Sequence, residues 1–418
     1  MNKIDKLIKN YFLIISWALY DLANQFFALN VISLYFVRWI TIEKQVPEIF
    51  YSISFGISTF FVALLSPVLG TFADITARHR MFLIFFTLLC IIFTIGLGFV
   101  NNVVLALVFF AIANLGCQAA VIFYNALMLN ITPQNKVGLV SGIGKMCGYL
   151  GAGIALFFTR PIMIEKGYQS TFILTGILFF LFALPCMLFV KDTPLKNNPK
   201  SQQDSQLWQI NGVFNRLKAT VINTRKFRGI QDLFKAAFFG LCVVNVLILF
   251  MSVYATKAFG LTNVEIIDFI AFSIVFAIAG SITSGIISDY FGCKKSMIGV
   301  FVLWVICIFS GGLVQPPYHW IVGALAGVSL GATWVVSRAF VVQIVPREII
   351  GEIFGMFNLV GYLACIAGPM LWGILILFLS PLGGLGYRIT LLCFIPLLII
   401  GIVFLTRIPE DRKLKNES

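Results

Sequence analysis

Charge is scarce in this sequence. Only 11% of its 418 residues are Asp, Glu, Lys or Arg, whereas 60% are hydrophobic and the mean hydropathy is +0.97. No water-soluble domain of this length needs so much apolar surface. The apolar residues form long continuous runs rather than alternating segments of about ten residues, which excludes an outer-membrane barrel. The sequence therefore predicts an all-α polytopic membrane protein.

Catalytic residues and motifs are also scarce. The two histidines, His79 and His319, lie in predicted loops, and neither H-E-x-x-H nor G-x-S-x-G in a suitable context occurs. A nucleotide-binding P-loop is missing too, so we expect a gradient rather than ATP to supply energy. The nine cysteines contain no C-x-x-C, and all except Cys293 lie in predicted spans. We therefore expect no enzyme, no metal and no cofactor.

Twelve apolar runs are long enough to cross a bilayer as helices, at roughly 1.5 Å of rise per residue. The basic start could be mistaken for a signal peptide, but the first run is too long and contains Asp21, so we interpret it as a spanning helix. The predicted spans cover residues 12–37, 49–73, 81–100, 103–130, 139–158, 170–190, 233–256, 265–287, 296–314, 319–345, 353–379 and 386–406.

The basic residues predict the orientation of these spans. Placing both termini in the cytoplasm leaves 21 of the 30 Lys and Arg in cytoplasmic segments, which is the positive-inside pattern. The net charge of +13 then reflects topology and contact with anionic lipid, not nucleic-acid binding. We expect an inner membrane of a bacterium. The six basic residues predicted to lie outside are Arg38, Lys44, Arg160, Lys166, Lys257 and Arg388.

The first span carries an acidic residue at mid-depth. In the segment SWALYDLAN, helical spacing places Trp17, Asp21 and Asn24 on one face and apolar side chains on the other. A carboxylate there costs about 2.5–3.5 kcal/mol by insertion scales. Asp21 is therefore either a substrate or proton site, or a buried partner in a permanent ion pair with a neighbouring helix. Its depth favours the first interpretation.

The chain contains an internal repeat. Gly70 and Asp74 recur 215 positions later as Gly285 and Asp289. Six more residues recur at a separation of 213, which is improbable by chance and indicates that six helices have been duplicated. These six are Pro133, Gly138, Gly142, Gly148, Tyr149 and Leu150, and they match Pro346, Gly351, Gly355, Gly361, Tyr362 and Leu363.

In this duplication the sequence resembles the major facilitator superfamily, whose members contain two six-helix halves with parallel pseudo-symmetry. SWALYDLAN and the segment from YNALMLNITP to GYLG are similar to its vacuole-effluxer-like branch, named for yeast vacuolar exporters of amino acids. The resemblance implies alternating access around a substrate site near the membrane midplane, in a protein that usually works as a monomer. The superfamily's loop motif is altered at Ala77, where a glycine is usual.

We accordingly expect a six-helix bundle at residues 1–191, a cytoplasmic linker at 192–231 and a second bundle at 232–418. In the linker, apolar residues recur at three- and four-residue steps from Leu207 to Val221 among basic residues. This pattern predicts an amphipathic helix at the membrane surface. It is either an inter-domain connector, which we favour, or a regulatory or partner-binding helix.

The repeated loop after the second span of each half is a candidate cytoplasmic gate. Its glycines would let a helix end approach a neighbour, and its aspartates would face the positive end of a nearby helix. Alternatively these are ordinary turn residues and topology charges. The gate residues are Gly70, Asp74, Arg78, Gly285, Asp289 and Lys294.

Polar residues within the spans are candidates for a transport path. In the superfamily's arrangement, spans 1, 4, 5, 7, 10 and 11 surround the cavity, and all the candidates lie on them. Lys145 is either a substrate anchor or the partner of Asp21; Arg338 either holds a carboxylate or braces two spans. The full set is Trp17, Asp21, Asn24, Asn114, Gln118, Tyr124, Asn125, Lys145, Tyr149, Asn245, Trp334, Arg338, Asn358 and Tyr362.

One negative and two positive charges in an aromatic cavity would suit a zwitterion with an apolar side chain. We expect a secondary transporter of an amino acid or similar metabolite, with efflux and proton coupling through Asp21 as further hypotheses. Its expected partners are a small-molecule substrate, protons and the lipid bilayer. The alternatives are a carrier of a siderophore, drug or sugar, and a non-transporting membrane sensor. Neither the linker nor the tail is the large output domain typical of a sensor.

Overall fold

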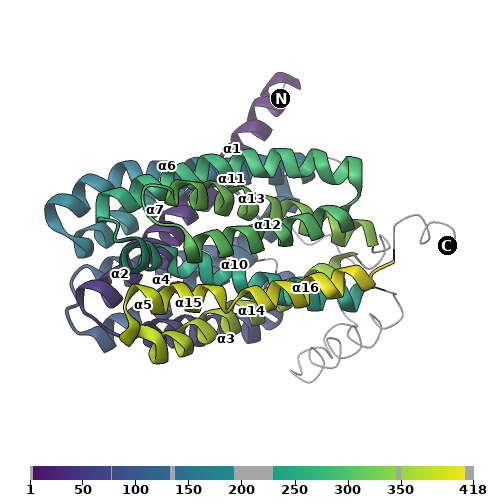
Figure 1. Ribbon diagram of the computed structural model, residues 1–418. Helices are drawn as coiled ribbons and strands as arrows, with labels where there is room; N and C mark the ends of the chain where they lie inside the picture. Colours follow the sequence, from purple (N-terminus) through teal and green to yellow (C-terminus); the bar gives the residue numbers. More distant parts are fainter. Residues whose placement is uncertain (1–2, 77, 132–136, 193–228, 345–349, 410–418) are drawn as a thin grey trace. The chain divides into compact units, whose positions relative to one another are not determined.

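The computed structural model describes residues 3–76, 78–131, 137–192, 229–344 and 350–409. Within these ranges the chain is helical, and twelve segments are long and apolar enough to cross a membrane. Figure 1 shows the helices running roughly lengthwise within each part of the chain. The predicted all-α architecture with twelve spans is therefore confirmed.

Two compact units make up the chain. Unit 1 comprises Met1–Val46 and Ile53–Val213, and unit 2 comprises Pro47–Ser52 and Phe214–Ser418. Unit 1 contains α1 (Lys3–Phe27), η1 (Ala28–Leu34), α2 (Tyr35–Arg38), η2 (Trp39–Glu43), most of α3 (Glu48–Thr76), α4 (His79–Leu97), α5 (Val103–Ile131), α6 (Val137–Lys166) and α7 (Tyr168–Phe189).

Unit 2 begins with the first residues of α3, because Pro47–Ser52 are grouped with it. The predicted amphipathic linker helix, from Leu207 to Val221, lies outside the described residues. The remaining helices of unit 2 are α10 (Ile230–Phe259), α11 (Asn263–Phe291), α12 (Cys293–Leu313), α13 (His319–Ile344), α14 (Ile350–Leu379), η6 (Ser380–Leu382), α15 (Gly384–Leu392) and α16 (Ile395–Arg407).

The helices of the two units pack in the same order. In unit 1, α1 contacts α6 and α7, and α4 contacts α5 and α7. In unit 2, α10 contacts α14 and α16, and α12 contacts α13 and α16. Each contact in the second set joins the helices that the duplication predicts as counterparts of the first. The sequence repeat therefore has a structural counterpart within each unit.

The first span is longer and less regular than its apolar run predicts. It extends over Tyr11–Glu43, six residues beyond the predicted end at residue 37. Its outer part contains two π-helical segments, η1 and η2, on either side of the single turn α2. Widened π-helical turns inside α-helices are rare and often occur at functional sites. This irregular part brings Asn30 and Arg38 into the interior of unit 1, where both are fully buried.

Small residues bring α1 and α6 close together. The buried cluster at this contact contains Leu22, Phe26, Ala155 and Leu178. A Cβ atom at Gly151 would lie only 2.6 Å from the backbone oxygen of Leu22, so a glycine is required for this approach. Because lipid tails provide no hydrophobic driving force between helices, close packing of this kind stabilises helix pairs in a membrane.

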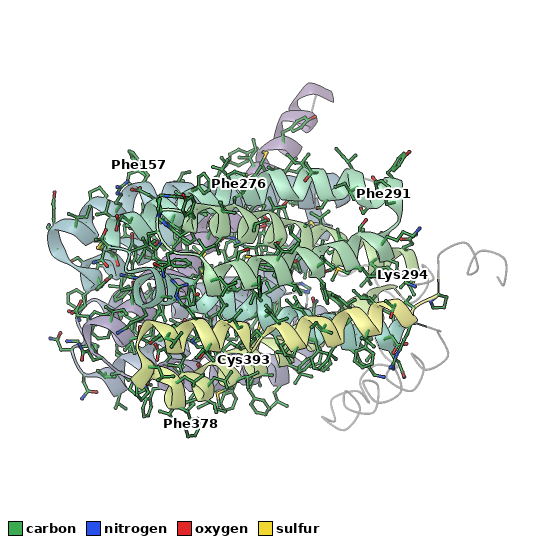
Figure 2. All side chains as sticks on the ribbon, viewed as in Figure 1. Phe157, Phe276, Phe291, Lys294, Phe378 and Cys393 are labelled. Atoms are coloured by element: carbon green, nitrogen blue, oxygen red, sulfur yellow. The ribbon has the colours of Figure 1, made fainter. Side chains whose placement is uncertain are left out.

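Large apolar side chains cover the outer surface of the helices. Phe157, Phe291 and Phe378 are among the most exposed aromatic residues, and Figure 2 shows them standing out from the ribbon. In water such exposure would be costly, but a bilayer solvates these rings. The exposed apolar surface therefore fits a protein surrounded by lipid.

Candidate functional site

The Asp21 carboxylate lies in an aromatic environment inside unit 1. Asp21 is 5% exposed, and Trp17 is one turn before it on α1. The Trp17 ring stacks on Tyr124 of α5 at 4.5 Å between centroids and 6° between planes. Trp17 Nε1 also donates to the Tyr124 carbonyl oxygen at 3.0 Å. These contacts hold the start of the SWALYDLAN segment against the middle of α5.

A second tyrosine completes the aromatic stack. Tyr20 packs on the other side of Tyr124 with a centroid distance of 4.8 Å. Its hydroxyl forms a 2.6 Å hydrogen bond with Thr87 Oγ1 of α4. The three rings of Trp17, Tyr20 and Tyr124 are thus fixed by contacts among α1, α4 and α5, next to the carboxylate in the sequence or in space. We name this group, together with Asp21, the Asp21 cluster.

The hydroxyl of Tyr124 faces the Asp21 carboxylate. It is buried, and both the charge of Asp21 and a side-chain contact with this carboxylate act on it, although the contact lacks ideal hydrogen-bond geometry. Buried hydroxyls nearly always have a partner, because leaving one unsatisfied costs free energy. A ligand that enters beside Asp21 could therefore bind both the carboxylate and this hydroxyl.

Helix α6 closes the cluster from another side. A Cβ at Gly144 would lie 2.8 Å from the Trp17 ring and 3.0 Å from Asp21 Oδ2, so only glycine fits this contact. The carboxylate thus lies against the helix that carries Lys145, the residue proposed as its partner or as a substrate anchor. The side chain of Lys145 lies outside the described residues. Tyr149, farther along α6, is half-buried.

The predicted amide stripe on α5 packs mainly against α3. Asn114 Nδ2 donates to Ser58 Oγ at 2.7 Å, and Gln118 Nε2 donates to Thr59 Oγ1 at 3.2 Å. Both amides are therefore used in contacts between helices. In a membrane such contacts satisfy polar groups that lipid cannot.

Two more asparagines of the predicted path lie near the ends of this stripe. Asn24 Oδ1 accepts from Cys117 Sγ at 2.9 Å, which joins α1 to α5. Asn125 is exposed and bonds to no other described residue. Among the predicted path residues on α5, the structure thus places Tyr124 in the Asp21 cluster and leaves Asn125 accessible.

Of the predicted path residues of unit 2, one forms hydrogen bonds with other described residues. Asn245 of α10 donates to the Leu241 carbonyl at 2.8 Å and accepts from Cys365 Sγ of α14 at 3.1 Å. Four others make no hydrogen bond or ion pair with another described residue. Two of them, Arg338 and Asn358, are exposed, and Trp334 and Tyr362 are half-buried.

Comparison with protein families identifies the superfamily of this chain. The model of the Major Facilitator Superfamily matches residues 20–280 and again residues 233–418. The chain belongs to the major facilitator superfamily. Superfamily members are transporters rather than enzymes, so this protein is a multi-pass secondary transporter.

Individual superfamily relatives agree with this assignment. The MFS-type transporter YxiO of Bacillus subtilis (strain 168) is 27% identical over 421 residues, which cover 95% of this chain and 94% of the relative. A Na(+), Li(+), K(+)/H(+) antiporter of Planococcus maritimus is 23% identical over 175 residues, or 40% of this chain and 39% of the antiporter. The crystal structure of the nucleoside transporter NupG matches with a TM-score of 0.72 at 14% identity, covering 97% of this chain and 99% of that chain.

The superfamily loop motif is only partly described. The side chain of Asp74 and the surroundings of Gly70 are not described, and Arg78 and Asp289 are exposed. A Cβ at Gly285 would lie 3.7 Å from Val335, an ordinary contact, so packing against α13 does not require glycine there. That this motif forms a cytoplasmic gate stays a prediction.

Two basic residues next to this motif join the same helices in both units. Arg80 Nε donates to the Met187 carbonyl at 2.6 Å, at the end of α7. Lys294 Nζ donates to the Thr406 carbonyl at 3.1 Å, at the end of α16. Figure 2 shows Lys294 at this end of unit 2. Cations are favourable at helix C-termini, because they compensate the unpaired carbonyls and the negative end of the dipole. Arg80 and Lys294 therefore make corresponding contacts in the two units.

Three buried polar residues were missed by the sequence analysis. Asn30 Nδ2 donates to Thr175 Oγ1 at 2.9 Å, and Arg38 Nε donates to the Tyr168 hydroxyl at 3.3 Å, both from the irregular part of the first span. Glu48, the first residue of α3, is 5% exposed. Arg38 and Glu48 lie at the ends of apolar runs, where charged residues are ordinarily solvated. The sequence offered no signal that these two would be buried.

Proposed function

We propose that this protein is a proton-coupled transporter of amino acids or similar small zwitterions, with Asp21 as the group that binds the proton or the substrate ammonium. The observation that carries the proposal is the Asp21 cluster: a buried carboxylate, faced by the Tyr124 hydroxyl, in an aromatic setting. Ionisable residues within membrane spans are costly, so they are kept mainly for function.

The geometry of the Asp21 cluster suits an ammonium group. The carboxylate supplies the negative charge that attracts an ammonium group. The Tyr124 hydroxyl supplies a further hydrogen bond. In the absence of substrate, protonation of Asp21 would remove the cost of a buried charge. Proton and ammonium would therefore compete for one carboxylate, which is a simple basis for exchange.

In unit 2, we propose Arg338 as a group that binds a carboxylate. Its exposed guanidinium has no ion pair with any described residue, so it is available to bind a carboxylate through two parallel hydrogen bonds. We assign the other predicted path residues of this unit, Asn245, Trp334, Asn358 and Tyr362, to the lining of the path. We propose the six-helix bundles at 1–191 and 232–418 as the two halves of the carrier.

The sequence motifs and the charges support the rest of the proposal. SWALYDLAN supports membership of the vacuole-effluxer-like branch, and hence export of amino acids. The positive-inside pattern supports cytoplasmic termini in a bacterial inner membrane. We propose a monomer as the working form, as is usual in this superfamily.

A second candidate function is exchange of a monovalent metal cation for protons. The sequence similarity to the Na(+), Li(+), K(+)/H(+) antiporter favours it, and that match covers 40% of this chain. A carboxylate that alternates between a proton and a metal cation would use Asp21 in the same way. The two candidates differ in whether an amino acid or an alkali cation moves.

Transport assays in liposomes test the proposal. The purified protein is reconstituted, and uptake of a panel of labelled amino acids is measured with and without an imposed pH gradient. We expect at least one amino acid to accumulate only with the gradient. Asp21→Asn should abolish this accumulation, because an amide neither takes up a proton nor binds ammonium as strongly. Asp268→Asn is the matched control, since it removes another carboxylate from a spanning helix outside the Asp21 cluster.

The same liposomes separate the candidates. Movement of Na(+), Li(+) or K(+) against protons, with no amino acid transported, would replace the primary proposal by the second one. Normal gradient-driven transport by Asp21→Asn would show that Asp21 carries neither function.

A further inference from the structure

A second buried carboxyl group lies far from SWALYDLAN in the sequence. Glu48 begins α3, within a candidate span, and its side chain is 5% exposed. The residues Pro47–Ser52 belong to unit 2, whereas α3 continues from Ile53 in unit 1. Glu48 therefore stands where the chain passes from one unit to the other.

The surroundings of Glu48 in unit 2 are mostly aromatic. The Tyr387 hydroxyl of α15 donates to Glu48 Oε1. The Tyr387 ring lies 6.4 Å from Trp372 of α14, which stacks on Phe250 of α10 at 5.6 Å. Tyr51, one turn after Glu48, packs edge-on against the same Phe250 at 5.8 Å. Such an environment gives little compensation for a negative charge.

No cation neutralises this carboxyl directly. Among the described residues, no Lys, Arg or His nitrogen lies within 4 Å of Glu48. The positive charge of Lys257 on α10 acts on the Glu48 carboxyl, but the Lys257 side chain itself is exposed.

The other charged or titratable groups nearby are engaged elsewhere or stay neutral. Arg388, next to Tyr387, donates to the carbonyls of Ala258, Gly312 and Val314. The phenol of Tyr254 on α10 donates to the Gly311 carbonyl at 2.6 Å. Tyr51 and Tyr387 are neutral phenols at ordinary pH. Glu48 is thus an acid whose donors are neutral, the Tyr387 hydroxyl and its own backbone N–H, and on which the exposed ammonium of Lys257 also acts.

We propose that Glu48 is a second proton-carrying group of the transport cycle, charged from the side of the membrane on which α3 begins. This inference rests on the proposed proton coupling. In the state described, Glu48 holds the proton: an O–H bond on the carboxyl keeps the group neutral, and Tyr387 donates to its other oxygen. When the site opens to water, the O–H bond breaks, the proton passes to water and the carboxylate is hydrated.

Burial and proton binding are linked in this scheme. The neutral acid is the form that the aromatic environment tolerates, so proton uptake favours the closed arrangement around Tyr387 and proton loss favours its opening. Asp21 has a different role, because we propose its cluster, which includes the Tyr124 hydroxyl, as the place where the substrate ammonium binds. Tyr387 is a positioning residue, since it holds the carboxyl but is not expected to titrate.

Infrared difference spectroscopy tests the protonation of Glu48 without any knowledge of the substrate. Spectra of the full-length protein in lipid are recorded at acidic and alkaline pH, in H2O and in D2O. A protonated carboxyl has a C=O band that is separate from the bands of a carboxylate and shifts in D2O. We expect such a band in the wild type and its loss in Glu48→Gln. Tyr387→Phe should shift the band without removing it, because one hydrogen bond to the carboxyl is lost.

Asp268→Asn should leave the Glu48 band unchanged and serves as the control. A wild-type spectrum with no band that disappears in Glu48→Gln would overturn the proposal. If Glu48→Gln does not fold, Glu48→Asp provides the test, since the shorter acid should keep a band at a shifted position. An unshifted band in Glu48→Asp would assign the band to another residue and overturn the proposal.

Transport of labelled leucine separates this inference from the proposed function. Glu48→Gln should lose net uptake driven by a pH gradient but keep leucine-for-leucine exchange, since exchange needs no net proton movement. Gradient-driven uptake by Glu48→Gln equal to that of the wild type would refute a coupling role for Glu48. Failure of the wild type to move any amino acid would instead count against the proposed function, and the infrared result would still decide whether Glu48 holds a proton.

Discussion

Three glycines on α6 allow a graded test of how closely this helix approaches α1. A Cβ at Gly151 would lie 2.6 Å from the Leu22 oxygen and 2.9 Å from Leu22 Cα, which are backbone atoms that cannot rotate away. At Gly144 the Cβ would meet the Trp17 ring at 2.8 Å and Asp21 Oδ2 at 3.0 Å, which are side-chain atoms. At Gly153 nothing lies within 4 Å.

These distances give an order of stability for the three alanine variants. Gly151→Ala must separate the two helices by several tenths of an ångström, at a cost of about 1–3 kcal/mol. Gly144→Ala should cost about 1 kcal/mol, because side chains can adjust. Gly153→Ala should be neutral or stabilising by up to about 1 kcal/mol, since alanine restricts the unfolded chain and favours the helix.

Thermal denaturation of the purified variants in one detergent measures the order, with gel filtration as a check of folding. We expect Gly153→Ala to denature at the highest temperature and Gly151→Ala at the lowest. We expect the order of transport activity to differ from the order of stability. Gly144→Ala should lose most transport activity, because it displaces the Asp21 carboxylate, whereas Gly153→Ala should keep its activity. A Gly151→Ala protein as stable as Gly153→Ala would refute the close approach of α1 and α6.

Two further predictions concern single polar groups. Tyr124→Phe should change stability by no more than about 1 kcal/mol, because the hydroxyl faces the Asp21 carboxylate without ideal hydrogen-bond geometry. It should nevertheless reduce transport, and unaltered transport kinetics would show that the hydroxyl does not meet the substrate. Arg80→Gln and Lys294→Gln should each lower stability by about 1–2 kcal/mol, since each removes a cation from a helix C-terminus. The exposed neighbours Arg78 and Lys295 should tolerate the same change. Equal effects in thermal denaturation at all four positions would contradict the proposed contacts between helices.

The sequence by itself was sufficient to predict the all-α architecture with twelve spans. In the interior of a bilayer, a helical chain must cross as long apolar helices, because lipid offers no partners for backbone polar groups. Each span is therefore visible in the sequence as a continuous apolar run. Duplication was visible because glycines, prolines and aspartates recur at a constant separation. The position of Asp21 within a candidate spanning helix was also readable, since it depends only on one helix. These features are local, or periodic along the chain.

The tertiary structure decided which polar groups meet. Glu48 looked like a solvated residue at the start of a span, and its burial depends on Tyr387, which is 339 positions away. Arg38 looked like a topology charge, yet π-helical turns carry it into the interior. Asn114 looked like a path residue, but Ser58 of another helix binds its amide. Helix rotation and packing set such pairings, and neither hydropathy nor periodicity records which helices will be neighbours.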